Sequence, residues 1–206
     1  ECFSKLFYMI NKTNHMDKKL ERNLIMGSLI VFLIITEFFS LKSGNLEFAY
    51  YIPLLVIFTI GLLVYNKELH LTNHILLAFA IIIVLHVFGG LIHLSGTRLY
   101  DMTFGILRYD NIIHAIASFI SALVAYNVLR PHLDKSVKKR YVYFGLILLL
   151  LTFGLGAVNE ILEFIAVVYF NAGAGVGGYV NTLKDLIFNA IGALIGVIVA
   201  IRYHLS

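Results

Sequence analysis

Six long runs of apolar residues restrict what this chain can fold into more than any other feature of its sequence. A helix needs about 20 mostly apolar residues to cross the hydrocarbon core of a bilayer. The six runs of roughly this length are 23–41, 49–65, 72–94, 109–129, 141–170 and 181–203. They predict an all-α fold, a polytopic membrane helix bundle with six transmembrane helices. Such a chain is a multi-pass protein of the cell membrane, and the lipid bilayer is its first partner.

The composition favours a membrane protein over a soluble one. Hydrophobic residues make up 60% of the 206 positions and charged residues only 14%, whereas soluble domains contain about 25% charged residues. The sequence has two prolines and no low-complexity stretch that would mark a linker, so we expect a single integral membrane domain over residues 1–206. The single cysteine, Cys2, excludes an internal disulfide.

The N-terminal segment 1–22 is basic and precedes the first apolar run. The chain begins with Glu1, and Met9 and Met16 are candidate start positions. A basic flank is typical of a signal peptide, but the stretch FFSLKSG after the run lacks a clear cleavage site of small residues. We therefore expect the first run to be retained as a helix.

The distribution of Lys and Arg predicts the orientation of the bundle. If both termini are cytoplasmic, the cytoplasmic segments carry 12 of the 16 basic residues and the outer segments carry three, with Lys184 inside the last run. Because positive residues concentrate on the cytoplasmic side, this ratio predicts an N-in/C-in topology. Basic clusters at 1–22 and 130–140 flank membrane runs, where they set topology and contact anionic lipid. We expect no nucleic-acid partner.

Polar side chains inside the runs fall on the extracytoplasmic side in this topology. They are Glu37, His86, His93, Asp110, His114, Asn159, Glu160, Glu163, Asn181, Asp185 and Asn189. Ionisable residues within a bilayer are costly, normally face the bundle interior and mark a site or an ion path. The pattern therefore predicts one polar site near the outer face. His86 and His93 would share a helix face, although no tight metal motif surrounds them.

Two pairs of ionisable residues point to cation binding or acid–base chemistry. Asp110 and His114 are four apart, so they can hydrogen-bond or share a metal; the alternative is a structural pair at the helix entrance. Glu160 and Glu163 are three apart and repel each other when both are ionised, which favours a bound cation or a raised pKa. The alternative for this pair is that one glutamate packs against Arg98 or Arg108.

The last run places Asn181, Asp185 and Asn189 on one helix face, because they are four residues apart. Asp185 is a candidate metal ligand or catalytic group, and the two amides either bind a substrate or orient their neighbours. Gly192 and Gly196 continue the same face, and small residues at this spacing let two membrane helices approach closely.

Two loops accompany the predicted site. The 95–108 loop supplies Arg98 and Arg108, which suggest binding of an anionic head group or phosphate, or merely screening of the acidic cluster. The Gly-rich loop at 171–178 lacks the Lys-Ser/Thr ending of a phosphate-binding loop and follows no strand. It is either a flexible cover over the site or a plain turn between helices.

Three motifs together resemble the VanZ-like superfamily of small membrane proteins. They are YDNIIH at 109–114, NEILEF at 159–164 and KDLIFNAIGALIG at 184–196. The superfamily pattern is similar to D-x-x-x-H, then E-x-x-[EQ], then D-x-x-x-N-x-x-G-x-x-x-G. The match covers about residues 105–200.

The helices before these motifs look more like the related, uncharacterised inner-membrane YjdF family. That family is richer in acidic residues before the last helix, where this chain has Gly178 and Asn181. The resemblance implies a multi-pass membrane protein of unsettled biochemistry. VanZ itself is associated with glycopeptide-antibiotic resistance, which suggests envelope or lipid-linked chemistry.

These observations leave three hypotheses and do not decide whether the chain is an enzyme. In the first, the site handles a phosphorylated or lipid-linked envelope molecule, with a divalent metal as the possible cofactor. The ligands or acid–base groups would be Asp110, His114, Glu160, Glu163 and Asp185, and the substrate-binding residues Arg98, Arg108, Asn181 and Asn189. In the second, the carboxylates form the proton relay of an ion-coupled transporter. In the third, the polar residues only hold the bundle together.

Overall fold

A computed structural model describes the backbone of residues 2–170 and 178–205, and most side chains from Asp17 to Tyr203 within those ranges. Six helices in this part of the chain are long and apolar enough to cross a membrane, which confirms the predicted all-α membrane bundle. They are α1 (Cys2–Ser43), α2 (Leu46–Val64), α4 (Asn73–Leu91), α5 (Tyr109–Leu129), α6 (Tyr141–Phe170) and α8 (Tyr179–Leu205).

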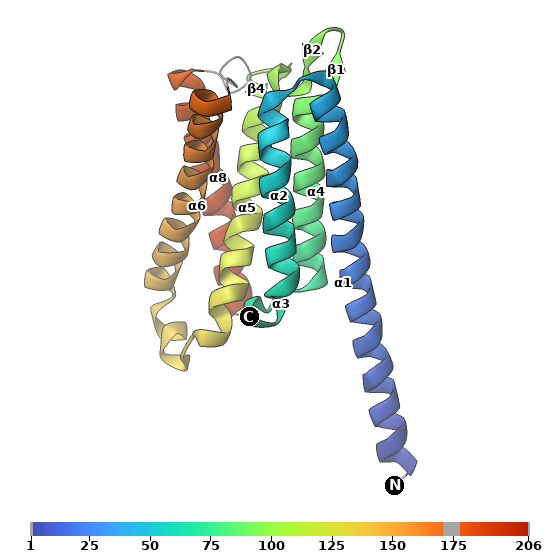
Figure 1. Cartoon of the computed structure of the whole chain (residues 1–206). Coiled ribbons are helices and arrows are strands. Elements are labelled where there is room, and N and C mark those ends of the chain that lie inside the picture. The colour runs from blue at the N-terminus through green and yellow to red at the C-terminus, as the bar shows by residue number, and fades with distance from the viewer. Residues whose placement is uncertain (1, 171–177, 206) are drawn as a thin grey trace.

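The first helix is much longer than the predicted run at 23–41. It begins at Cys2, and its membrane-competent part covers Asp17–Ser43. Residues 2–22 contain neither Gly nor Pro, so nothing in the sequence interrupts the helix before the apolar run. The basic N-terminal segment therefore continues the same helix beyond the bundle (Figure 1).

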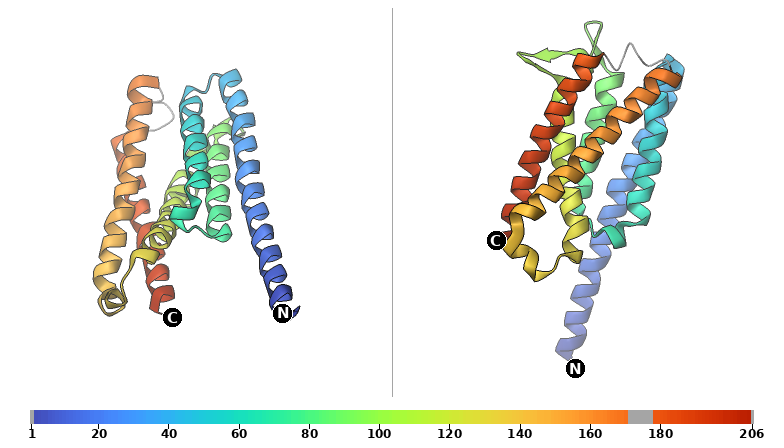
Figure 2. Two further views of the ribbon diagram at one scale, coloured as in Figure 1. Left: turned by 60° about the horizontal axis from the view of Figure 1, so that its bottom comes forward. Right: turned by 90° about the vertical axis from the view of Figure 1, so that its left-hand side faces the viewer.

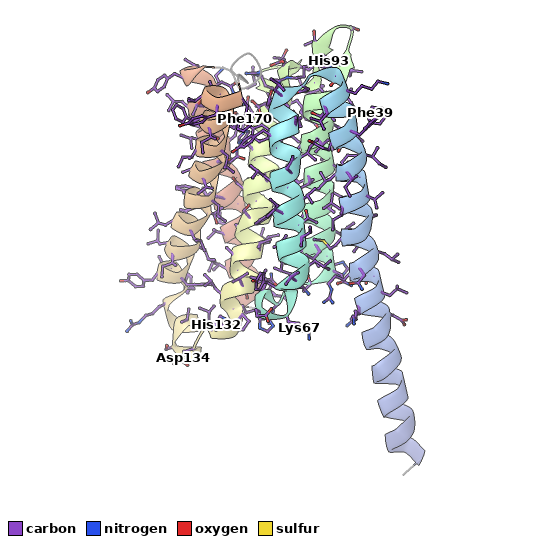
Figure 3. The ribbon with its side chains drawn as sticks, in the orientation of Figure 1. Phe39, Lys67, His93, His132, Asp134 and Phe170 are labelled. Carbon is purple, nitrogen blue, oxygen red and sulfur yellow. The ribbon has the colours of Figure 1, made fainter. Side chains whose placement is uncertain are left out.

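The bundle has two ends, where short segments connect one helix to the next. The end that we call the hairpin end carries the α1–α2 turn and two small hairpins, β1 (His93–Leu94) with β2 (Thr97–Arg98), and β3 (Thr103–Phe104) with β4 (Leu107–Arg108). The opposite end, which we call the terminal end, carries both chain termini (Figure 1). It also carries the connectors α3 (Asn66–Leu69), η2 (Arg130–His132) and η3 (Lys135–Arg140). Figure 3 labels His93 and Phe170 at the hairpin end, and Lys67, His132 and Asp134 at the terminal end.

The fourth helix ends at Leu91, three residues before the predicted end of the third apolar run. His93 lies instead on strand β1, where it is exposed. The reversal between β1 and β2 occurs at Ser95 and Gly96, which both have positive φ values (51° and 83°), as a tight hairpin turn requires. The expectation that His86 and His93 share a helix face is therefore wrong.

The backbones of α5 and α8 approach each other closely at two glycines. A Cβ atom added to Gly192 would lie 1.9 Å from the carbonyl oxygen of Ala115, and one added to Gly196 would lie 2.7 Å from that of Phe119. Because no real side chain tolerates such distances, only glycine permits the two backbones to approach this closely. The close approach predicted from the glycine spacing is present.

Helix α6 leans across the bundle; its 30 residues would be about 45 Å long as one helix, longer than a hydrocarbon core of about 30 Å. At the terminal end a Cβ atom on Gly145 would lie 3.6 Å from Ile201 of α8, so the two helices are in contact there. At the hairpin end the ring of Phe170 stacks on Tyr50 of α2, with ring centroids 4.5 Å apart. The right-hand view of Figure 2 shows this oblique course, which brings Glu160 and Glu163 toward α5.

Candidate functional site

The imidazole of His114 on α5 is the centre of a buried polar cluster near the hairpin end. His114 Nε2 lies 3.4 Å from Asp110 Oδ1, one turn earlier on the same helix. The same nitrogen lies 3.8 Å from Glu163 Oε1 of α6 and 4.0 Å from Asp185 Oδ1 of α8. Three helices thus bring three carboxylates to one side of a single imidazole ring.

Two amides position the carboxylate of Asp185, whose side chain is fully buried. Asn111 Nδ2 on α5 donates to Asp185 Oδ1 at 3.0 Å, and Asn181 Nδ2 on α8 donates to Asp185 Oδ2 at 2.6 Å. Asn181 Nδ2 also donates to Asp110 Oδ2 at 3.2 Å. Both aspartates are therefore fixed by hydrogen bonds that leave lone pairs available toward His114.

The opposite side of the ring faces Glu160 and Asn189. His114 Nδ1 lies 3.7 Å from Glu160 Oε1 and 3.3 Å from Asn189 Oδ1, which also accepts a hydrogen bond of 2.8 Å from Ser118 Oγ. The Glu160 side chain is only 9% exposed. Within the described part of the chain, neither of its oxygens has a hydrogen-bond partner, and neither does Asn189 Nδ2.

Burial of this many charges without compensation is costly. The cluster contains four carboxylates and one imidazole, so if all four carboxylates are ionised, a protonated His114 neutralises only one of the four negative charges. Buried charges are normally paired or bound to a metal. The side-chain placement therefore leaves room, electrostatically, for an additional cation.

The donor atoms are close enough to share one ion. Asp110, His114 and Asp185 each offer one ligand atom, and these atoms lie within 4.8 Å of one another; the same holds for His114, Glu160 and Glu163. Two ligands on one divalent ion are separated by at most about 4.4 Å, because metal–nitrogen and metal–oxygen bonds are about 2.0–2.2 Å long. The 3.4–4.0 Å spacings around Nε2 already meet this limit.

The two ring nitrogens of His114 have different surroundings, which suggests different roles for them. On the Nε2 face Asp110, Glu163 and Asp185 surround a nitrogen that can bind a metal directly. On the Nδ1 side Asn189 Oδ1, at 3.3 Å, can accept the proton of Nδ1–H, which is the usual way in which a metal-binding histidine is oriented, and Glu160 lies beside it at 3.7 Å. Asn159 further fixes Glu163 by donating a hydrogen bond of 2.8 Å to its Oε1.

A chain of charged contacts connects this cluster to the hairpins. Arg108, which directly precedes α5, bonds to Asn181 Oδ1 and pairs through Nη2 with Asp101 Oδ1 at 2.7 Å. Asp101 Oδ2 in turn accepts from Arg98 Nε at 3.0 Å. Arg98 Nη1 pairs with Glu47 Oε2 at 2.8 Å. The sequence of contacts therefore runs from Glu47 on α2 to the buried aspartates.

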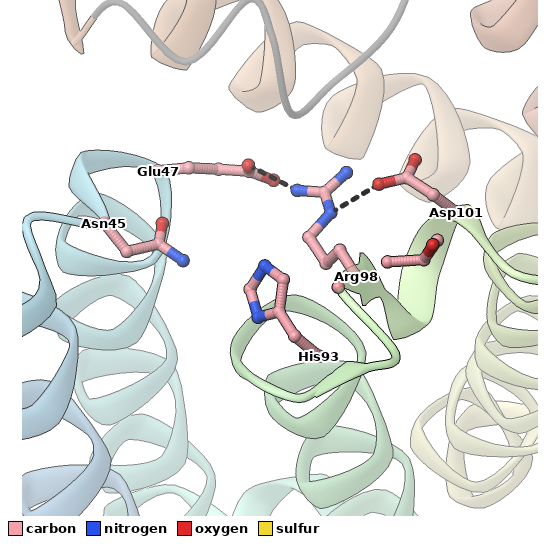
Figure 4. Close-up of a pocket in the computed structure, with 7 residues that line it drawn as sticks. Asn45, Glu47, His93, Arg98 and Asp101 are labelled. Atoms are coloured by element: carbon pink, nitrogen blue, oxygen red, sulfur yellow. Dashed lines mark hydrogen bonds and ion pairs between the residues drawn. The ribbon is translucent and has the colours of Figure 1, made fainter.

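Figure 4 shows Arg98 between the carboxylates of Glu47 and Asp101, in a shallow cavity of about 490 Å³ at the hairpin end. The cavity is lined by Asn45, Glu47, His93, Gly96, Thr97, Arg98 and Asp101. Burial by itself would lower the pKa of Arg98, but the neighbouring carboxylates of Glu47 and Asp101 outweigh it and raise that pKa above its ordinary value. Arg98 is thus held permanently charged at the mouth of the bundle.

The structure brings together most of the residues that the sequence singled out. Asp110, His114, Glu160, Glu163, Asn181, Asp185 and Asn189 meet in one cluster. Arg108 touches this cluster through Asn181, whereas Arg98 belongs to the outer network with Glu47. His114, and not an arginine, lies within 4 Å of both glutamates. The Gly-rich loop at 171–178 lies, except for Gly178, outside the described residues.

The remaining histidine of the predicted set has a separate environment. His86 on α4 shares a hydrogen bond through Nδ1 with the hydroxyl of Tyr100. Its ring also packs against that of Phe48, with ring centroids 5.3 Å apart. Burial raises the pKa of Tyr100 well above its usual value, so this hydroxyl stays protonated. The pair anchors the short helix η1 (Leu99–Asp101) against α4.

Three polar residues of the network were missed by the sequence analysis. Asn111 and Ser118 are seven apart on α5 and flank His114, so the helical period that selected His114 also places them on its face. Glu47 gave a weaker signal, because it lies in the first turn of α2, where an acidic residue normally serves the helix terminus.

A family model described as "Predicted membrane protein (DUF2238)" matches residues 22–206. No curated protein matches the chain, and no solved structure matches it. The matched region includes all six membrane-competent helices apart from the first residues of α1.

Proposed function

The chain belongs to the DUF2238 family of predicted membrane proteins, and from this premise we propose that it binds a divalent cation and acts on a phosphorylated or lipid-linked molecule of the cell envelope. The cation would lie among Asp110, His114, Glu160, Glu163 and Asp185. The observation that carries the proposal is the convergence of these side chains from three helices on one imidazole.

The site would face away from the cytoplasm. Lys67 and the basic connectors between α5 and α6 lie at the terminal end (Figure 3), together with both chain termini (Figure 1). The positive-inside rule assigns that end to the cytoplasm. The acidic cluster, near the hairpin end, then opens toward the extracytoplasmic side, where envelope precursors are available.

The choice of a cation rests on the buried carboxylate of Glu160, whose Oε1 lies 3.7 Å from His114 Nδ1, too far for a hydrogen bond. A buried carboxylate without hydrogen bonds is rare, because the desolvated charge costs several kcal/mol unless it is compensated. Glu160 Oε1 and Oε2 have no hydrogen-bond partner among the described residues, yet they lie beside a site that already holds three further carboxylates. A mixed set of carboxylate and imidazole ligands suits Mn²⁺, Zn²⁺ or Fe²⁺.

Such an ion would polarise a phosphoryl oxygen or lower the pKa of a bound water molecule. Asp110, Asp185 and Glu163 would act with His114 Nε2 as ligands, and Glu160 would orient the ring or serve as a general base. Asn181 and Asn189 would contact the substrate or hold the ligands in place. Arg98 and Arg108 would receive its anionic group. The resemblance of the three motifs to the VanZ-like and YjdF families is compatible with this envelope chemistry.

A transporter is the second candidate, and the distribution of polar groups disfavours it. From Gly192 toward the terminal end, the α5–α8 contact is made by residues such as Gly196, Ala122 and Ala125. A relay would need polar groups along the whole path through the membrane. The described network instead ends at Ser118 and Asn189, about one turn from His114.

Cation binding can be tested with the full-length chain purified in a chelator and reconstituted in nanodiscs. Titration with Mn²⁺ or Zn²⁺ should raise the thermal unfolding temperature, because an ion that binds only the folded state stabilises it. Asp185→Asn should abolish this rise. Glu68→Gln, an exposed acid-to-amide change on α3 at the other end of the bundle, should leave it intact.

Two results would contradict the proposal. One is the absence of any cation-dependent shift in the unmodified protein. The other is an equal shift in Asp185→Asn and in the unmodified protein. Membrane lipid extracts from cells that express Asp185→Asn, compared with those from cells that express the unmodified chain, would then report whether envelope lipids change with the site.

A further inference from the structure

One exposed carboxylate binds both arginines at the hairpin end. Asp101 Oδ1 pairs with Arg108 Nη2 at 2.7 Å, and Asp101 Oδ2 pairs with Arg98 Nε at 3.0 Å. The two guanidinium groups come from different strands, β2 and β4, and converge on a single anion. This is the arrangement that a bound phosphate group would take between two arginines.

The three side chains differ in how firmly they are held. Arg98 is 12% exposed and has a second partner in Glu47, and Arg108 has a second partner in Asn181. The side chain of Asp101 is 43% exposed. The arginines would therefore keep their positions if Asp101 turned toward solvent, whereas Asp101 has the freedom to leave.

Departure of Asp101 need not disturb the backbone around it. Its neighbour Tyr100 is buried, bonds to His86 and packs edge-on against Tyr109, with ring centroids 5.8 Å apart. Arg98 also lies over the Tyr100 ring, 5.6 Å from its centroid. The short helix η1 is thus anchored, and a rotation of the Asp101 side chain would break its ion pairs with both arginines without displacing the backbone.

The position of the two arginines relates them to the buried cluster. Arg108 bonds to Asn181, whose amide nitrogen contacts both Asp110 and Asp185. An anion bound to Arg108 would therefore lie one amide side chain away from the proposed cation site. A phosphate group would carry more oxygen atoms and more charge than the carboxylate it replaces, so it could bond to both arginines and still present an oxygen inward.

We propose that Arg98 and Arg108 form a binding site for a phosphate group, and that Asp101 occupies this site as an internal competitor until the phosphate group displaces it. This inference rests on the proposed function, because it identifies the part of the same site that recognises the substrate. The phosphate group could belong to a soluble phosphate ester or to a lipid head group, since both present the same oxygens.

The test uses the full-length chain in nanodiscs of phosphatidylcholine, in the presence of a chelator, titrated with inorganic phosphate by calorimetry. Asp101→Asn should bind phosphate roughly tenfold more tightly, because two partly exposed ion pairs no longer compete. Arg98→Gln and Arg108→Gln should each weaken or abolish phosphate binding. The chelator removes divalent ions, so the outcome is independent of whether the cation site exists.

Two variants control for charge alone. Lys42→Gln removes a positive charge from the end of α1 at the hairpin end, and Glu68→Gln removes a negative charge at the terminal end; neither should change phosphate affinity. Thermal unfolding of each variant identifies misfolded protein, and Asp101→Ser replaces Asp101→Asn if the latter does not fold. Phosphate affinity that stays unchanged in the Asp101 variant, or in both arginine variants, would overturn the inference.

A second set of nanodiscs distinguishes the two sources of phosphate. When phosphatidylglycerol replaces part of the phosphatidylcholine, an anionic head group in the site would compete with inorganic phosphate. Apparent phosphate affinity of Asp101→Asn would then fall several-fold, which supports a lipid head group as the occupant. Equal affinity in both nanodiscs supports a soluble phosphate ester.

Discussion

The two halves of the α5–α8 contact have opposite chemistry. Toward the terminal end, Gly192 and Gly196 bring the backbones together, and alanines such as Ala122 and Ala200 fill the space. Toward the hairpin end, the same two helices face each other with Asn111, His114 and Ser118 on one side, and with Asp185 and Asn189 on the other. The first half consists of small side chains and the second of polar ones.

This difference shows how a membrane bundle can hold a polar cluster. Close backbone contact in the glycine half fixes the distance and rotation of the two helices, because membrane helices associate through packing and not through the exclusion of water. Without this contact, repulsion between the acidic side chains of the polar half would push the helices apart. The polar half is held in register by its glycine neighbour, and its position near the membrane surface lowers the cost of its charges.

The largest effect is expected when a glycine of the α5–α8 contact is replaced by a residue with a large side chain. In Gly192→Leu, even the first side-chain atom would lie 1.9 Å from the carbonyl oxygen of Ala115, so α5 and α8 must separate. We expect the free energy of unfolding to fall by more than about 4 kcal/mol, a loss that only severe changes in a protein core cause. The measurement is the yield of monodisperse protein after extraction.

Two glycines elsewhere serve as controls for this change. An added Cβ at Gly154 on α6 or at Gly61 on α2 has nothing within 4 Å. Gly→Ala at either position should leave the yield unchanged or raise it slightly, because alanine favours a helix by about 1 kcal/mol. If Gly192→Leu gave the same yield as these controls, the close α5–α8 contact would not be needed to hold the bundle together.

The next effect concerns the centre of the polar half. His114→Gln removes the nitrogen around which three carboxylates lie, and it should weaken Mn²⁺ or Zn²⁺ binding by more than about 100-fold, the upper range for losing only an indirect metal contact. Competition with a fluorescent chelator measures this change. His74→Gln, near the terminal end of α4, is the matched control and should bind the ion normally.

The sign of the effect at Glu160 separates a cation site from a purely structural cluster. In the chelated protein, Glu160→Gln removes one negative charge and breaks no described hydrogen bond. It should therefore stabilise the ion-free protein by about 1 kcal/mol, while it reduces the stabilisation that added cation provides. A structural role predicts the opposite, a lower unfolding temperature in chelator, and thermal unfolding with and without Mn²⁺ distinguishes the two.

The smallest effect is expected at the boundary between the two halves. Ser118→Ala removes the 2.8 Å hydrogen bond to Asn189 Oδ1 and should cost about 1 kcal/mol of stability. Ser121→Ala lies three residues further along α5, where the side chain is half-buried, and should cost less than about 0.5 kcal/mol. Equal losses in the two variants would show that Ser118 belongs to the packing and not to the network.

The sequence predicted the membrane class, the six helices and most of the cluster, because each depends on short-range patterns. Apolar runs of sufficient length identify membrane helices, and spacings of three and four residues place Asp110 with His114, Glu160 with Glu163, and Asp185 with both asparagines. The orientation of the chain relative to the cytoplasm stays a prediction. The shortening of α4, by contrast, depended on the packing and turn geometry that follow Leu91, and the apolar run gave no sign of it.

What the sequence alone determined is therefore which residues share a helix face, since that follows from the period of the helix. Only the tertiary structure decided which faces meet: that Glu160 lies on the Nδ1 side of His114 while Glu163 lies on the Nε2 side, and that Asp101 occupies both arginines. These relations depend on the tilt of α6 and on the conformation of two hairpins. Both result from contacts between residues far apart in the chain, which no local pattern encodes.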